Sequence, residues 1–141
     1  MFQTVVVGAD GSPTAAEAVR QAIEVAKLTG GMLHIVTAYK PQQLHSPAGH
    51  EFAKSMDTVD LADSLLADLG SRARVSGVLT ELHAETGDPA DAICEVADQV
   101  GADLIIVGNK GMAGARRVLG SVPNSVAHKA PCSVLIAFTT G

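Results

Sequence analysis

The stretch Leu104-Ile105-Ile106-Val107-Gly108 decides the fold of this 141-residue chain. Its first four residues are apolar without alternation, which is typical of a strand buried on both faces of a parallel sheet. Gly108 ends the strand. Parallel strands need long crossover connections, usually helices, and these cover the two faces. The stretch therefore predicts an α/β fold.

Strand and helix patterns alternate outward from this stretch. Thr4-Val5-Val6-Val7 predicts a first strand, and Ser12 is the expected N-cap of a helix over 15–28 that ends at Gly30. Further strands are predicted at 32–38, 78–84 and 133–138, with helices over 51–74, after Asp88-Pro89 and after Gly120-Ser121. The alternation predicts a parallel sheet with helices on both faces and right-handed crossovers, in one domain over 1–141. The 78–84 strand alternates weakly, which favours an edge position.

The charge balance excludes several classes of partner. Ten basic residues stand against 15 acidic ones, for a net charge of -5. This charge gives no general attraction to nucleic acid or to an anionic membrane. No signal-peptide pattern and no apolar run of ~18 residues occurs, so we expect a cytoplasmic protein. Cys94 and Cys132 lie far apart in apolar segments, where free thiols are the commoner state.

A glycine-rich segment follows the central strand. It reads Gly108-Asn109-Lys110-Gly111, then eight residues, then Gly120-Ser121 before a helical pattern. Glycine allows positive φ and close approach of the backbone to a ligand, and the N–H groups at a helix start favour an anion. Ser121 is expected either to cap the helix or to donate its hydroxyl to a phosphate. Lys110 is the best local cation.

Other chemistry has no support in the sequence. The Walker A, dinucleotide-binding, Gly-x-Ser-x-Gly, His-Glu-x-x-His and Cys-x-x-Cys patterns do not occur. The five histidines have no spacing that indicates a metal site. No general base is evident, so we expect a binding protein and not an enzyme, with slow hydrolysis at most.

Three segments carry a resemblance to a known family. Residues 5–12, 103–111 and 120–122 together resemble the universal stress proteins, and the match spans essentially the entire chain. The resemblance implies a five-stranded parallel sheet in the order 3-2-1-4-5 and a homodimer paired through the last strand, 133–138. In the ATP-binding branch of the family it also implies a Gly-x-x-Gly-(nine residues)-Gly-Ser/Thr motif.

The resemblance also implies roles for individual residues. Asp10 would face the ribose and adenine, and the backbone near Thr37 and Ala38 would meet the base. The phosphates would lie against the glycines and Ser121. The complete predicted nucleotide site is Gly8, Ala9, Asp10, Thr37, Ala38, Val107, Gly108, Lys110, Gly111, Gly120, Ser121, Val122 and Pro123, with no catalytic residue and no metal ligand.

One departure from the family pattern leaves alternatives open. Eight residues, not nine, separate Gly111 from Gly120. The shorter loop leaves undecided which phosphates are held and whether Mg²⁺ joins them. The leading hypothesis is an ATP-binding regulator; the alternatives are a cyclic AMP-binding module and a dimeric interaction protein that binds no nucleotide. Asp10 as a simple turn residue also stays open.

Overall fold

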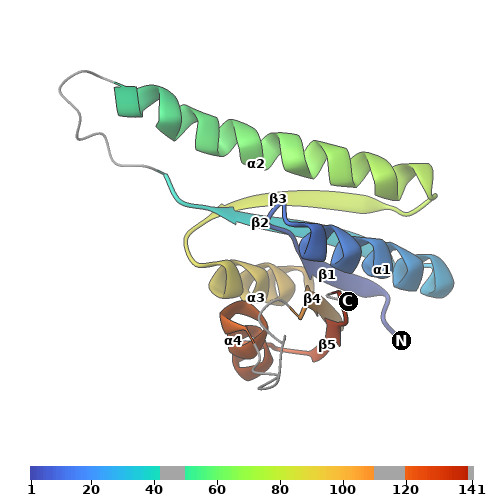
Figure 1. Ribbon diagram of the computed structural model, residues 1–141. Coiled ribbons are helices and arrows are strands. Elements are labelled where there is room, and N and C mark those ends of the chain that lie inside the picture. Colours follow the sequence, from blue (N-terminus) through green and yellow to red (C-terminus); the bar gives the residue numbers. More distant parts are fainter. Residues whose placement is uncertain (42–49, 110–119, 140–141) are drawn as a thin grey trace.

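The computed structural model describes residues 1–41, 50–109 and 120–139, and the side chains of the second helix from residue 58 onward. A five-stranded parallel sheet runs through the middle in the order β3-β2-β1-β4-β5 (Figure 1). This confirms the predicted fold class and strand order. The elements are β1 Thr4–Gly8, α1 Pro13–Thr29, β2 Met32–Tyr39, α2 His50–Val75, β3 Thr80–Thr86, α3 Pro89–Val100, β4 Leu104–Gly108, α4 Ser121–Lys129 and β5 Ser133–Ala137.

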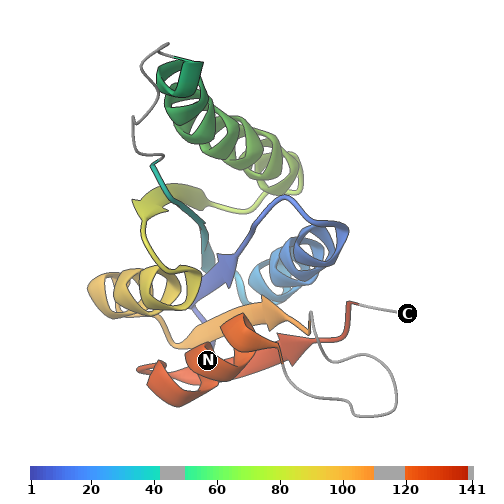
Figure 2. The same cartoon turned by 60° about the vertical axis from the view of Figure 1, so that its left-hand side comes forward.

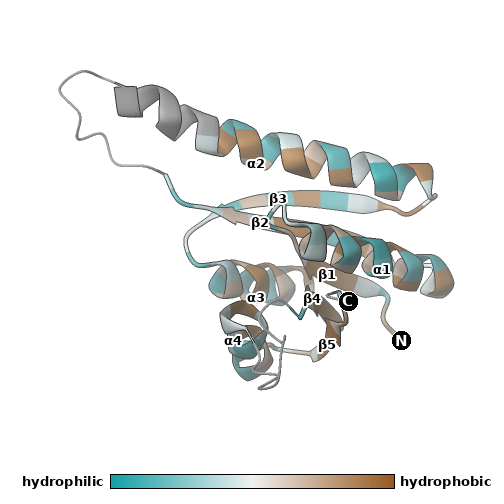
Figure 3. Ribbon diagram, in the orientation of Figure 1, coloured by the Kyte–Doolittle hydropathy of each residue, from teal (hydrophilic) through white to brown (hydrophobic). Residues whose placement is uncertain are grey.

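Helices cover both faces of the sheet (Figures 1 and 2). Alternate residues of β1 and β4 divide between two cores, because successive strand side chains point to opposite faces. Val5 and Ile106 pack with α1 and α2, and Val6 and Ile105 pack with α3 and α4. The central strands are brown along their length in Figure 3, whereas the helices alternate between brown and teal. The unbroken apolar run at 104–107 therefore reports burial on both faces, as predicted.

The predicted starts of two helices are confirmed. Ser12 Oγ accepts a hydrogen bond from Ala15 N at 3.1 Å, and the Asp88 side chain accepts one from Asp91 N at the same distance. Gly30 ends α1 in the left-handed conformation, with φ at 70°. Such residues satisfy backbone groups that a helix end leaves unpaired.

Of the two roles that the sequence leaves open for Ser121, the structure excludes the N-cap. Gly120 occupies the N-cap position, with extended φ and ψ of -63° and 165°, and its carbonyl accepts the first helical hydrogen bond, from Asn124 N. Ser121 is already the first helical residue, and its side chain is exposed. Because glycine has no side chain, α4 begins without a side-chain cap.

The two edge strands of the sheet each have a feature of their own: β3 begins later than predicted, and β5 has an exposed apolar residue. β3 begins two residues later than predicted, because Val78 is used in the turn after α2, where its N–H donates to Ala73 O. Gly70 does not end α2; a Cβ there would lie 3.0 Å from Leu82 of β3, so the glycine lets helix and strand pack closely. On the other edge, β5 leaves Leu135 exposed.

Within the described residues no helix is both long and apolar enough to cross a membrane.

Candidate functional site

A pocket opens at the carboxyl ends of β1 and β4, beside β2, where ligands bind in doubly wound sheets. Apolar side chains of Val36, Ile93 and Val107 line it. The structure brings many of the predicted site residues together here: Gly8, Ala9, Asp10, Ala38, Val107, Gly108, Val122 and Pro123. Segments far apart in the sequence therefore meet at one cavity.

The remaining predicted residues lie around this pocket or outside the described part of the chain. Thr37 is buried and lines a neighbouring hollow, shared with Asp10 and Ala38, between β2 and α2. Gly120 and Ser121 directly precede the pocket-lining residues of α4. Lys110 and Gly111 are not among the described residues. The stretch 41–49 has two prolines and no periodicity, which predicts a loop; its residues 42–49 also lie outside the described part of the chain.

The site glycines owe their place to packing and not to unusual backbone angles. Gly8 and Gly108 are absent from the described glycines with positive φ. A Cβ on Gly8 would lie 2.5 Å from Ile93 Cδ1, and one on Gly108 would lie 3.4 Å from the carbonyl oxygen of Thr14. Gly108 and Gly120 therefore do not use the positive φ that glycine permits, and the close approach at Gly8 and Gly108 involves the protein's own atoms.

Asp10 is the turn residue between β1 and α1. Its Oδ1 accepts a hydrogen bond from Ser12 N at 2.9 Å, and Ser12 in turn caps α1. This is the local Asx geometry that aspartate favours in turns. The turn places the exposed Asp10 carboxylate at the pocket. The hydrogen bond from Ser12 N therefore both stabilises the turn and fixes the position of the negative charge.

Three helices begin at the pocket. Each helix start contributes one residue to the lining of the pocket. These residues are Ser12 just before α1, Pro89 at the start of α3 and Val122 in the first turn of α4. Helix N-termini carry partial positive charge and free N–H groups. Side chains cap α1 and α3, whereas no side chain of the described residues caps α4. The α4 N-terminus is therefore the best-placed group to receive an anion.

Asn109, which directly follows the pocket-lining Gly108, has a structural role that the sequence reasoning missed. It is buried directly after β4, and its Oδ1 accepts hydrogen bonds from Thr139 N at 2.8 Å and Thr139 Oγ1 at 2.7 Å. These two hydrogen bonds connect the end of β4, directly after Gly108, to the segment that follows β5. A polar residue directly after a buried strand is the signal that could have found it.

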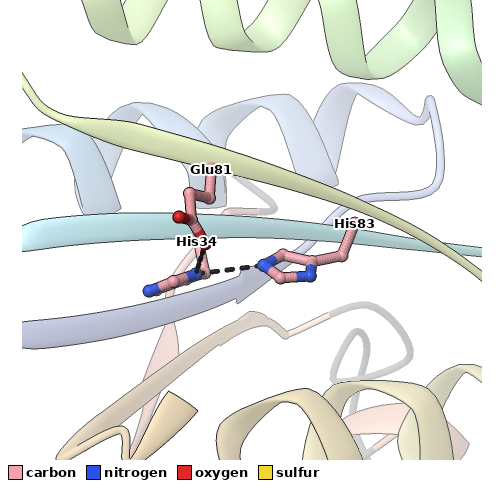
Figure 4. Close-up of side chains that lie close together, drawn as sticks. All are labelled: His34, Glu81 and His83. Atoms are coloured by element: carbon pink, nitrogen blue, oxygen red, sulfur yellow. Dashed lines mark hydrogen bonds and ion pairs between the residues drawn. The ribbon is translucent and has the colours of Figure 1, made fainter. Parts of the chain in front are cut away.

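A second polar cluster, also missed, lies on β2 and β3, and its residues do not line the pocket (Figure 4). His34 Nδ1 is 3.0 Å from His83 Nε2 and 3.5 Å from Glu81 Oε2. Burial lowers the pKa of His34, the nearby His83 lowers it further, and Glu81 opposes both. The strand register pairs His34 with Glu81, which sequence spacing alone does not reveal.

The two cysteines are free and half-buried, as the sequence predicts. Each packs against the core on the α3 and α4 side of the sheet. Burial raises the pKa of both the Cys94 and the Cys132 thiol. Neither thiol has the lowered pKa of a nucleophilic cysteine.

Comparisons with known proteins identify the family. Residues 1–137 match the model of the universal stress protein family. A universal stress protein of Mycobacterium tuberculosis is 37% identical over 145 residues, covering 99% of this chain and 98% of its own length. A crystal structure of a universal stress protein in complex with cAMP is 38% identical, with a TM-score of 0.77, covering 99% of this chain and 98% of that one.

A more distant solved structure has the same fold. The universal stress protein from Archaeoglobus fulgidus in complex with dAMP is 26% identical, with a TM-score of 0.67, and the match covers 96% of this chain and 98% of that chain. Each match covers nearly the full length of both proteins that are compared. The two TM-scores agree with the five-stranded parallel fold. The chain belongs to the universal stress protein family.

Proposed function

We propose that this protein binds an adenine nucleotide in the pocket at the ends of β1 and β4. The observation that carries the proposal is the combination of an apolar lining with the uncapped N-terminus of α4 at its rim. A purine needs an apolar surface, and a phosphate needs N–H donors and positive charge. The similar protein solved with cAMP supports this choice of ligand.

The Asp10 carboxylate, the one charged side chain among the described residues that line the pocket, supports a direction for the ligand. Asp10 is anionic and repels phosphate, but its carboxylate can accept hydrogen bonds from ribose hydroxyls. The phosphates then lie at the α4 N-terminus, within reach of Ser121 and the backbone. The base lies toward Thr37 and Ala38 on β2. In the proposal, Lys110, Gly111 and Gly120 complete the phosphate side.

ATP and cyclic AMP are the two leading ligands. The resemblance to the ATP-binding branch favours ATP, with Mg²⁺ on the phosphates. The complex of the 38% identical protein favours cAMP, which places less demand on the shortened loop between Gly111 and Gly120. In either case we propose a regulatory role in the cytoplasm: nucleotide occupancy changes the contacts of a single-domain protein, with little or no turnover.

Calorimetric titration tests the proposal. The full chain is titrated with ATP, ADP, AMP and cAMP, each with and without Mg²⁺. Binding of at least one adenine nucleotide is expected, and dependence on Mg²⁺ would assign the polyphosphate form. If none of the four binds, the chain is not a nucleotide receptor, and the alternative of a nucleotide-free interaction protein takes its place.

A further inference from the structure

The cluster of His34, Glu81 and His83 belongs neither to the nucleotide pocket nor to a predicted site. We propose that these three side chains form a binding site for a divalent transition ion of the Zn²⁺ class, with an open fourth position. The proposal does not depend on nucleotide binding. It rests on the way in which two neighbouring parallel strands place two imidazoles and a carboxylate on one side of the sheet (Figure 4).

The strand register creates the cluster. His34 on β2 pairs directly with Glu81 on β3, and His83 stands two residues further along β3. Residues i and i+2 of a strand point to the same face, so the side chains of Glu81 and His83 both accompany that of His34. This is the face covered by α3, because Leu33 and Ile35 of β2 pack on the opposite side.

The spacing of the three ligand atoms suits tetrahedral coordination. His34 Nδ1 lies 3.0 Å from His83 Nε2 and 3.5 Å from Glu81 Oε2, and all three atoms lie within 4.8 Å of one another. A tetrahedral Zn²⁺ with ligands at 2.0–2.1 Å separates them by about 3.3 Å. The two separations from His34 Nδ1 bracket that value, and the third lies within the 4.8 Å limit, so a side-chain adjustment of Glu81 or His83 can close the tetrahedral geometry.

The hydrogen-bonding capacity of the cluster also favours a cation. When both histidines are neutral, His34 Nδ1 and His83 Nε2 share one hydrogen at most, and Glu81 Oε2 brings only lone pairs. A hydrogen on one of the two nitrogens must then be shared by two acceptors, the other nitrogen and Glu81 Oε2, whereas one metal ion takes a lone pair from each of the three atoms. Two histidines and a glutamate are also a known ligand set for zinc with a free fourth position.

Burial gives the site an anchor and an entrance. The His34 side chain is 4% exposed and held within the sheet, whereas the Glu81 side chain is 56% exposed. An ion can therefore enter from the Glu81 side and meet a pre-positioned imidazole. A bound ion would tie the edge strand β3 to β2 and add to the stability of that edge.

Co²⁺ titration of the chelator-treated full chain tests the site, because Co²⁺ substitutes for Zn²⁺ and its absorption reports the ligands. We expect one Co²⁺ per chain, displaced by Zn²⁺, with d–d absorption and no thiolate-to-cobalt band. Glu81→Gln and His83→Gln should each weaken binding at least about tenfold, since even loss of an outer-shell partner costs that much. At the same Zn²⁺ concentration, Zn²⁺ should raise the Tm of the unchanged protein more than that of either variant.

Glu85→Gln is the matched control, because Glu85 lies on the same strand and the same face and its substitution removes the same charge. It should leave Co²⁺ affinity unchanged. Circular dichroism confirms folding of each variant; Glu81 is exposed, and its amide replacement keeps the side-chain size. Absence of binding, equal affinity in Glu81→Gln and the parent, or a thiolate band that assigns the ion to Cys94 or Cys132 would each overturn the site.

Discussion

Asp103 joins the starts of two neighbouring strands. It precedes β4, and its carboxylate accepts hydrogen bonds from Gln3 N at 3.0 Å and Thr4 N at 3.1 Å at the start of β1. Desolvation raises the pKa of Asp103, but the backbone hydrogen bonds from Thr4 and Gln3 act together with others against it. The net result is a pKa below the usual 3.8.

Asp103→Asn should lower the free energy of unfolding by about 1 kcal/mol at neutral pH, since charge-assisted hydrogen bonds become neutral ones at a partly exposed site. The folded-state pKa lies below the unfolded one. The stabilisation is therefore fully present above 3.8 and is lost as pH falls through the folded pKa. Urea unfolding is measured at a series of pH values from neutral down through this acid range. The difference in free energy of unfolding between Asp103→Asn and the parent protein should shrink as the pH falls. A gap that stays constant would contradict the assignment.

Asp10 combines a turn contact with a proposed ligand contact, and Asp10→Asn separates the two. The amide oxygen can still accept from Ser12 N, so stability should change little, whereas the charge offered to ribose is lost. We expect roughly tenfold weaker binding of the preferred nucleotide in calorimetry, the effect of about 1.4 kcal/mol. Asp63→Asn, exposed on α2, is the charge-matched control. Unchanged affinity in Asp10→Asn would limit Asp10 to the turn.

At the scale of elements, α4 differs from α1 and α3 in the way it begins. Ser12 and Asp88 cap their helices with side chains, whereas Gly120 leaves α4 without such a cap. Pro123 has no N–H, so the first turn of α4 offers the backbone N–H groups of Ser121 and Val122. The absence of a competing side-chain cap is what suits this helix start to an external anion.

Ser121→Asp should change stability and nucleotide binding in opposite directions. A negative charge in the first turn interacts favourably with the helix dipole, by about 0.5 kcal/mol. The same charge repels the phosphates and should weaken binding by about tenfold or more, with a smaller loss at high salt. Thermal unfolding and calorimetry measure the two effects. Ser121→Asn, which is uncharged, is the control; equal affinities of the two variants would place the phosphates elsewhere.

At the scale of the whole molecule, β5 presents an apolar edge. Leu135, Ile136 and Phe138 are exposed at or next to this strand. An exposed apolar edge strand is a template for pairing with another chain. We propose that the protein forms a homodimer through 133–138, as the family resemblance implies.

Leu135→Lys should convert the dimer to a monomer, because it places a charge at the proposed interface. Sedimentation equilibrium of the full chain measures the change in mass. Leu28→Lys makes the same substitution at an exposed leucine at the end of α1, and it should leave the dimer intact. A monomeric parent protein, or a Leu135→Lys variant that stays dimeric, would rule out this interface.

The alternation of strands and helices was predictable from local patterns. The apolar run at 104–107 and the caps at Ser12 and Asp88 each act within a few residues, so their physics is visible in sequence. The strand order came with the family resemblance. The sequence left the cap of α4 open between alternatives because a glycine and a serine stand side by side at the helix start, and only the backbone angles of Gly120 show where the helix begins.

The sequence by itself determined the fold class and the chain segments that form the candidate pocket, because periodicity and strand-end glycines are local properties. Tertiary structure alone decided the contacts between distant residues. Asn109 meets Thr139 across 30 positions, and His34 meets His83 across 49. Such pairs depend on strand register, and a shift by one residue turns every side chain to the other face. No local pattern carries that information.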